Sequence, residues 1–307
     1  MKFKILILLA VLTISCGKLS EKAKDAVDSI SGENLEDSGN LIAYNNAMID
    51  YLSDTGSKIE SAANDYDKMR AMVTQKRKPS MSFMGHAFIG SLPDINSNRD
   101  GISLLKPGNN LPSDIKEKLV ASMKVTSESF ENTKNAYAKF KKYLDLEDFK
   151  DDDWVKGKEY VDIIEKNITS FYDQRSKAYE IIKPLADAAE IELLKDHPLK
   201  EVLIASKTDL SLVDEIIDIV YAENVDIDAL NSKYTELENN AKKHRVLTPE
   251  LLKEHDKESS YKSFYEQLDD FLGEVRKYKR DGKITEREAD YIRREYKYLV
   301  GDYNRFV

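Results

Sequence analysis

Cys16 is the only cysteine of the chain, and its position predicts a chemical modification. It follows Leu12-Thr13-Ile14-Ser15, so a small residue precedes the thiol at the end of an apolar run. Bacterial lipoprotein processing requires this arrangement, because only a nucleophilic sulfur takes the diacylglycerol group. Cleavage before Cys16 would leave that residue as an acylated N-terminus. The alternative is an ordinary secretory signal with an incidental cysteine, but reserving the only thiol for an anchor suits an oxidising compartment.

The residues before Cys16 have the pattern of a signal peptide, and we expect residues 1–15 to be removed. Lys2 and Lys4 supply a positive start, and the apolar run after them is too short to span a bilayer. Acyl chains contribute about 0.8 kcal/mol per buried methylene, so the lipid on Cys16 should anchor the protein to a membrane of the cell envelope. Gly17 in place of aspartate favours the outer over the inner membrane in a Gram-negative host.

Other residues capable of chemistry do not form a catalytic or metal-binding motif. Only His255 and Glu258 have the helical spacing that places two metal ligands on one face, and surface charge explains a lone pair of this kind better. A zinc-peptidase motif, a phosphate loop and a nucleophile elbow are absent from the sequence. We therefore predict no catalytic, cofactor-binding or metal-binding residues, no cofactor and no enzymatic activity.

The charge of the chain argues against a nucleic-acid partner. The formal net charge is −9, and an acidic protein neutralises phosphates only through a local basic patch. Two basic blocks occur, Lys76-Arg77-Lys78 and Lys242-Lys243-His244-Arg245. We interpret both as solvated helix ends, where cations favour the helix dipole.

The elements that carry these residues are predicted to be helices throughout. Residues 16–40 begin with the acylated cysteine, and the rest are mostly small, polar or charged. This composition indicates a flexible tether. From Leu41 onward, apolar residues recur in steps of three and four, a spacing typical of helices and not of strands. We predict an all-α fold, a bundle of long antiparallel helices with one long irregular loop, forming one domain over residues 41–307.

Caps and breakers set the expected limits of the first helices. The first should end before Lys78-Pro79, and the second should begin after Pro112-Ser113. The third should run from about Trp154 toward Lys195, and Pro184 should kink or break it.

The C-terminal part should continue with shorter helices. We expect residues 202–221 to form one or two helices interrupted near 208–211, and Asp226 or Asp228 to start the next. Thr248-Pro249-Glu250 should open a helix that Asp281-Gly282 ends, because glycine adopts the left-handed conformation readily. A capping box from Thr285 to Glu288 opens the last helix, which should form a hairpin with the one before it.

The irregular loop is expected between residues 76 and 113, which contain four of the seven prolines. A disordered loop should be less apolar, so we expect this one to pack across the bundle. The alternative is a flexible surface for a partner or an apolar ligand. Its apolar residues are Met81, Phe83, Met84, Phe88, Ile89 and Leu92.

The corner between the second and third helices carries a family resemblance. Tyr143, Phe149, the aspartates 151–153, Trp154 and then Lys156-Gly157-Lys158 together resemble the YiiG-like family of bacterial lipoproteins. Where family members often continue with an apolar residue and histidine, this chain has Tyr160-Val161. The resemblance implies an extracytoplasmic helical lipoprotein, and it brings no established activity.

Two physical interpretations of this corner are open. In the favoured one, Asp152 and Asp153 cap a helix start, and Trp154 anchors the corner beside Phe149 and Tyr143. In the other, residues 151–153 hold a cation, although consecutive carboxylates diverge and calcium-loop spacing is absent.

A tether, a rigid helical body and the lack of visible chemistry together predict a non-enzymatic interaction protein of the cell envelope. Its expected partners are the membrane, through the lipid on Cys16, and an envelope protein or the cell wall. The alternative is a carrier of an apolar small molecule or lipid, bound between helices beneath the 76–113 loop.

Overall fold

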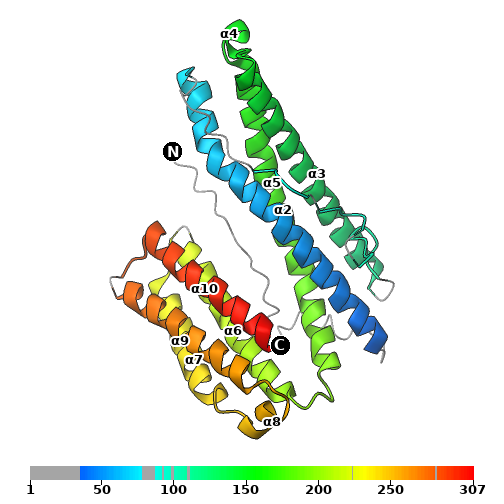
Figure 1. Ribbon diagram of the computed structural model, residues 1–307, viewed down its shortest axis with the longest axis vertical. Helices are drawn as coiled ribbons and strands as arrows, with labels where there is room; N and C mark the ends of the chain where they lie inside the picture. Colours follow the sequence, from blue (N-terminus) through cyan, green and yellow to red (C-terminus); the bar gives the residue numbers. More distant parts are fainter. Residues whose placement is uncertain are drawn as a thin grey trace. The chain divides into compact units, whose positions relative to one another are not determined.

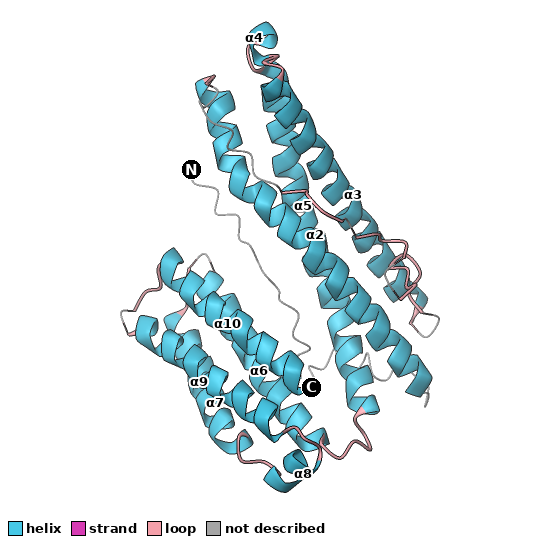
Figure 2. Ribbon diagram, viewed as in Figure 1, coloured by secondary structure: helices cyan, strands magenta, loops and turns pink. Residues whose placement is uncertain are grey.

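The computed structural model describes residues 35–77, 87–91, 93–97, 100–108, 111–222, 224–280 and 282–307. Cys16, the predicted signal peptide and most of the predicted tether lie outside these residues. The described chain is helical and contains no strand, which confirms the predicted all-α class (Figure 2). None of its helices is long and apolar enough to cross a membrane.

The described chain divides into an N-terminal unit that ends at Leu185 and a C-terminal unit, Ala186–Val307. The prediction of one domain over residues 41–307 stays a prediction. Helix α5 (Val155–Leu193) belongs to both units and continues across Pro184, so of the kink or break predicted there the break does not occur, and the kink stays a prediction. Ile182 before the proline and Leu185 after it are both buried, and this packing maintains the helix although proline lacks an N–H donor.

The N-terminal unit consists of α2 (Leu35–Gln75), α3 (Ser113–Asp145), α4 (Phe149–Asp152) and most of α5 (Figure 1). Helix α2 begins inside the predicted tether segment, and its Ser38 is already buried. The core is rich in aromatic side chains drawn from the three long helices. Its large members include Tyr66, Phe130, Tyr137, Phe140, Tyr143, Trp154 and Phe171.

The described part of the 76–113 loop packs against this unit, as predicted. Phe88 meets the rings of Phe130 and Tyr137 edge-on, at centroid distances of 5.7 and 5.5 Å. Leu104 is buried, and its carbonyl accepts a hydrogen bond from the Tyr44 hydroxyl at 2.8 Å. Ile89 is an exception, with 64% exposure. Met81, Phe83, Met84, His86 and Leu92 lie outside the described residues.

The predicted aromatic corner is present at the end of α3. Trp154 is buried and stacks on Phe149 at 4.5 Å, with Tyr143 edge-on at 6.2 Å. Asp152 accepts hydrogen bonds from the Trp154 and Lys156 amides at 3.1 Å and from the Tyr143 hydroxyl at 2.5 Å. The capping role predicted for Asp152 is therefore confirmed.

The capping role predicted for Asp153 is wrong. Its backbone adopts a left-handed conformation (φ 51°), and its carboxylate, 75% exposed, pairs with Lys76 beyond the end of α2. The Asp152 carboxylate accepts from the Trp154 and Lys156 amides at this corner, whereas the Asp153 side chain is directed to Lys76 instead of to the start of α5.

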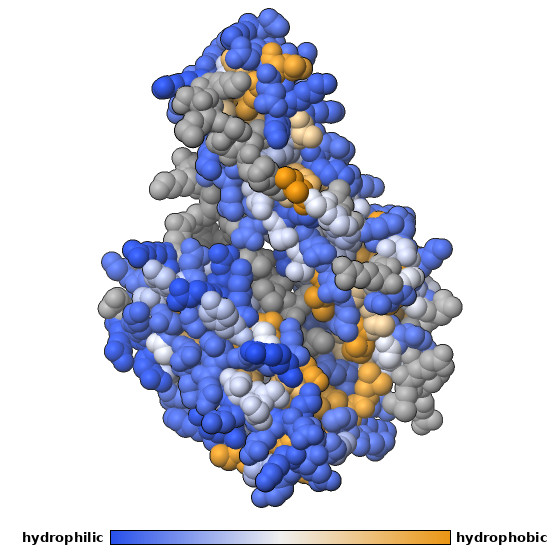
Figure 3. Space-filling model, in the orientation of Figure 1, coloured by the Kyte–Doolittle hydropathy of each residue, from blue (hydrophilic) through white to orange (hydrophobic). Residues whose placement is uncertain are grey.

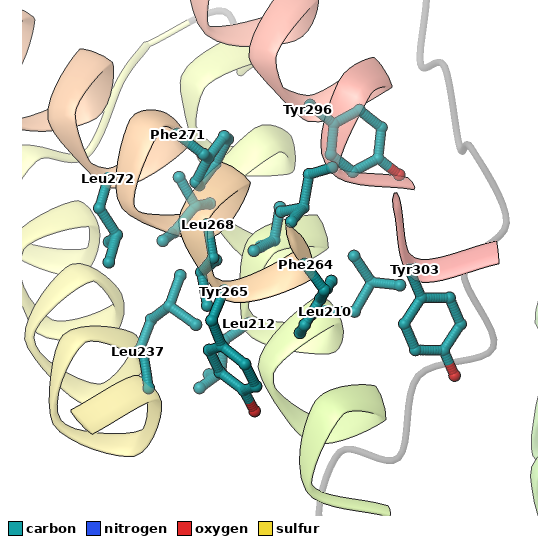
Figure 4. Close-up of a cluster of buried hydrophobic side chains, with 14 of the residues drawn as sticks. Leu210, Leu212, Leu237, Phe264, Tyr265, Leu268, Phe271, Leu272, Tyr296 and Tyr303 are labelled. Atoms are coloured by element: carbon teal, nitrogen blue, oxygen red, sulfur yellow. The ribbon is translucent and has the colours of Figure 1, made fainter. Parts of the chain in front are cut away.

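The C-terminal unit consists of the end of α5 and five further helices (Figure 1). They are α6 (Lys200–Tyr221), α7 (Ile227–His244), α8 (Pro249–Glu254), α9 (Glu258–Lys279) and α10 (Glu286–Phe306). Figure 4 shows their shared core, in which Leu210, Leu237, Phe264 and Tyr296 come from four different helices. Helices α9 and α10 pack on each other and form the predicted hairpin.

Helix α6 is continuous, so the predicted interruption near residues 208–211 is wrong. Its small polar side chains do not compete with the helix. The Ser206 hydroxyl donates to the Val202 carbonyl and the Thr208 hydroxyl to that of Ile204, one turn back, and the backbone hydrogen bonds are kept.

The helix starts and stops in this unit follow most of the predicted signals. Asp226 caps α7 by accepting a hydrogen bond from the Ala229 amide, and the capping box of α10 is complete at Thr285. Gly282 has φ 68° after α9, as expected of a helix stop. Thr248, in contrast, makes no side-chain cap, and the helix it precedes ends at Glu254.

Candidate functional site

A buried carboxylate, an imidazole and a phenol meet inside the C-terminal unit. Asp209 of α6 is fully buried, and its Oδ2 lies 2.9 Å from His244 Nδ1 at the end of α7. The Tyr265 hydroxyl of α9 donates to the same oxygen at 2.9 Å. We call these three residues the Asp209 cluster. Three helices supply one residue each, so the cluster depends on how the helices pack.

The electrostatics of the cluster are those of an acid withdrawn from water. Burial raises the pKa of Asp209 above its ordinary value of 3.8, and the hydrogen bonds from His244 and Tyr265 oppose that rise without cancelling it. Burial, together with the nearby carboxylate, also raises the pKa of Tyr265 well above its ordinary range. The second oxygen, Asp209 Oδ1, is buried and has no hydrogen-bond partner among the described residues.

Contacts around the cluster hold the end of α7 in place. The His244 carbonyl at the helix end accepts hydrogen bonds from the Tyr261 hydroxyl at 2.6 Å and from the Leu247 amide at 2.9 Å. Burial raises the pKa of Tyr261 to about 12, so this hydroxyl keeps its proton. Arg245 forms two hydrogen bonds to Asp269 of α9, at 2.7 and 3.0 Å. His244 is therefore fixed through both its side chain and its backbone.

His244 also lines a hollow on the surface of the same unit. This hollow, which we call the His244 hollow, has a volume of about 630 Å³. Its walls are the first half of α6, the end of α7 and the residues that follow it. The lining residues are Pro198, Lys200, Glu201, Ile204, Ala205, Thr208, Asn240, His244 and Leu247.

The imidazole has one nitrogen left for a ligand at this hollow. Nδ1 is engaged by Asp209, whereas Nε2 makes no hydrogen bond to a described residue. The His244 side chain is 21% exposed, so solvent and small molecules reach it. A buried carboxylate that orients a histidine toward a cavity equips the site for hydrogen bonding or proton exchange.

A second, smaller hollow of about 330 Å³ lies on the other side of Leu247. Tyr261 and Tyr265 line it together with Arg245, so the Asp209 cluster reaches both hollows. The hydroxyls of both tyrosines are already engaged, by His244 and Asp209, which leaves this hollow without a free polar group from the cluster.

The metal alternatives raised by the sequence find no geometric support. His255 follows the last residue of α8, and Glu258 begins α9 after Asp256, which has φ 54°. The two side chains therefore do not share one helix face. Nowhere in the described ranges do three or more histidine, cysteine, aspartate or glutamate side chains gather as a metal site, and this includes residues 151–153.

Sequence reasoning missed the Asp209 cluster. The basic block that contains His244 was assigned to a helix end, and Lys242, Lys243 and His244 do occupy the last turn of α7. Asp209 lies 35 residues earlier and Tyr265 is 56 residues from Asp209. A hint was available in Asp209 itself, a carboxylate flanked by the apolar residues of what proves to be one continuous, largely buried helix.

The fold and the site together define an all-α protein with two helical units and a ligand-sized hollow in the second. The chain belongs to the family described as "Domain of unknown function (DUF6845)", which it matches over residues 32–196. The matched segment contains α2 to α5 and ends before the Asp209 cluster. Comparison with curated protein sequences gives no match.

Two solved structures have a similar fold. One is described as an alpha helical protein from Bacteroides fragilis NCTC 9343, with 18% identity and a TM-score of 0.59. The other is an uncharacterized DUF3829-like protein from Bacteroides thetaiotaomicron VPI-5482, with 19% identity and a TM-score of 0.53. Each similarity covers 87% of this chain and 98% of the other chain. At this level of identity the similarity shows the fold alone. The family match and the two structures agree with the prediction that the chain belongs to an uncharacterised bacterial family.

Proposed function

We propose that this protein is a lipid-anchored, non-enzymatic binding protein of the cell envelope that recognises an envelope component through its C-terminal unit. The observation that carries the proposal is the His244 hollow, where a buried carboxylate holds a histidine in the wall of a cavity large enough for a ligand. The Cys16 motif supports lipid anchoring, with the outer membrane favoured in a Gram-negative host.

The lining of the hollow supports binding over catalysis. The Thr208 hydroxyl donates to the Ile204 carbonyl at 2.9 Å, and no serine or cysteine is among the described lining residues. A histidine without a neighbouring nucleophile suits recognition better than covalent chemistry. Side chains on the face shown in Figure 3 are mainly hydrophilic, with apolar side chains in smaller groups, so the described residues of that face offer no broad apolar patch for recognition.

The test is crosslinked co-purification from intact cells that express the wild type, Cys16→Ser, Thr208→Arg or Thr235→Arg. Thr208→Arg fills the hollow, and Thr235→Arg places the same side chain at an exposed position of α7. We expect one envelope component to be recovered with the wild type and the Thr235→Arg control, and lost with the other two variants. Equal recovery with Thr208→Arg would exclude the hollow as the recognition site.

Acylation is tested separately by metabolic labelling with a palmitate analogue. Wild-type protein should incorporate the label and partition into detergent, and Cys16→Ser should do neither. Labelling of the variant would show that another residue carries the lipid. The finer assignment to the YiiG-like family rests on the corner motif and stays a prediction.

The alternative function, a carrier of an apolar small molecule, is favoured by one feature of the same hollow. Ile204, Ala205 and Leu247 give it an apolar surface. Native mass spectrometry of protein released from membranes should then show a bound small molecule in the wild type that Thr208→Arg has lost. Protein of apo mass in both samples would argue against a carrier.

A further inference from the structure

We propose that the His244 hollow binds a small monocarboxylate with an apolar chain, and that the ligand's carboxylate lies between His244 and Lys200. This inference rests on the proposed function because it uses the same recognition site, and it adds the chemical class of the ligand. Three features of the lining lead to it: a histidine of fixed orientation, one cation beside one anion, and an apolar surface.

The first feature is the fixed orientation of the imidazole. A carboxylate accepts hydrogen bonds and does not donate them, so the contact of Nδ1 with Asp209 Oδ2 at 2.9 Å places a hydrogen on Nδ1. The Tyr265 hydroxyl of α9 donates a hydrogen bond to the same carboxylate oxygen at 2.9 Å. The ring cannot turn without breaking this chain, so Nε2 is the nitrogen offered to a ligand. When Nε2 carries a proton it donates to an anion, and such charge-assisted bonds are about twice as strong as neutral ones.

The second feature is the charge around the hollow. Lys200 lies in the first turn of α6, and its ammonium forms no ion pair with a described residue. Glu201 contributes one negative charge to the same lining. A single ligand carboxylate gains from Lys200 and His244, and Glu201 repels a dianion more strongly than a monoanion. Arg245, which lies close enough to Asp209 to lower its pKa, is itself paired with Asp269. These charges favour a monoanion.

The third feature is the apolar part of the lining. Pro198, Ile204, Ala205 and Leu247 supply carbon surface next to the polar groups. An acyl chain that covers them would gain about fourfold in affinity for each fully buried methylene. A short carboxylate such as acetate lacks this term, so a chain of several carbons is needed for binding.

The experiment is equilibrium dialysis of radiolabelled octanoate against the full-length, lipid-anchored protein in lipid nanodiscs, with empty nanodiscs as the blank. Octanoate, 1-octanol and acetate separate the contributions of the charge and the chain. We expect saturable binding of about one octanoate per protein. Binding of 1-octanol should be at least tenfold weaker because it lacks the charge-assisted contact, and binding of acetate should be at least tenfold weaker because it lacks the apolar chain.

Two variants of the hollow are paired with matched controls. His244→Gln and Lys200→Gln should each weaken octanoate binding about tenfold. His255→Gln and Lys243→Gln make the same changes outside the hollow and should leave binding unchanged. Lys200→Gln is a substitution at a partly exposed position, so it tests the site even if His244→Gln disturbs the fold. Histidine ring ¹⁵N spectra give an independent readout, in which octanoate should shift the His244 Nε2 resonance.

Equal binding of octanoate and 1-octanol would overturn the proposal, because the hollow would then recognise the chain alone. Absence of saturable octanoate binding, or unchanged binding in both hollow variants, would overturn it as well. If octanoate does not bind but Thr208→Arg still loses the envelope component in the crosslinking experiment, the hollow remains the recognition site and only the proposed ligand class is wrong. If octanoate does not bind and Thr208→Arg also recovers the envelope component, the proposed function is wrong as well.

Discussion

Gly157, in the first turn of α5, should be intolerant of the small substitution Gly157→Ala. A Cβ added there would lie 2.9 Å from Cε1 of Tyr143 and 3.4 Å from Cε3 of Trp154. The Tyr143 ring has little freedom to move away, because its hydroxyl is bonded to Asp152 and its edges contact other aromatic rings. The added methyl group must therefore displace packed, rigid groups.

The magnitude follows from two opposing effects. Overpacking of a filled core costs about 1–3 kcal/mol, and replacing glycine by alanine inside a helix returns up to about 1 kcal/mol. Since the Tyr143 ring is held at both ends, we expect Gly157→Ala to destabilise the N-terminal unit by about 1–2 kcal/mol. The matched control is Gly273→Ala in α9, where nothing lies within 4 Å of the added Cβ. That variant should stabilise the C-terminal unit by about 0.5–1 kcal/mol.

Urea unfolding monitored by two probes distinguishes these outcomes. Trp154 is the only tryptophan, so its fluorescence reports on the N-terminal unit, whereas far-ultraviolet circular dichroism follows the helices of both units. The urea midpoint measured by fluorescence should fall for Gly157→Ala and stay unchanged for Gly273→Ala. Gly273→Ala should instead raise the midpoint of the dichroism transition that reports on the C-terminal unit. A higher fluorescence midpoint for Gly157→Ala would refute the proposed packing of the corner.

The remaining predictions concern the C-terminal unit. Tyr265→Phe removes a hydrogen bond to the buried carboxylate and should cost about 2 kcal/mol in urea unfolding, whereas Tyr298→Phe, at a position 56% exposed, should cost nothing measurable. The folded chain holds the Asp209 proton more tightly than the unfolded chain, because burial raises its pKa above 3.8. The resulting stability is complete below about pH 4 and is lost as the pH rises through the raised pKa. Melting temperatures of Asp209→Asn and wild type from about pH 3 to about pH 7 should therefore show a weaker decline for the variant, and parallel curves would contradict this sign. Thr285→Ala removes the cap of α10 and should cost about 1 kcal/mol by circular dichroism, with Thr235→Ala, at an exposed helix position, as the control that should cost less.

The sequence by itself determined the features that depend on neighbouring residues. The three- and four-residue steps predicted an all-α chain, because helical periodicity is a property of each segment alone. Thr285 was correctly predicted as a cap, and Asp226 was one of the two residues predicted to start its helix, since a cap bonds to an amide within three residues. Trp154 and Asp152 were placed at a corner for a similar reason, since their partners Tyr143, Phe149 and Lys156 are near them in the sequence.

Tertiary structure decided what depends on packing between distant segments. Helix α5 continues across Pro184 and α6 continues past Thr208, although proline lacks an N–H donor and small polar side chains disfavour a helix. In both helices the burial of apolar side chains outweighs this local cost. The helix opened by Thr248 ended early, at Glu254, although the apolar stripe continued through Tyr278. Periodicity identifies the buried face of a helix, but it does not specify which other helix covers that face. Asp209, His244 and Tyr265 meet only because α6, α7 and α9 pack around one core, and that arrangement is a property of the folded chain.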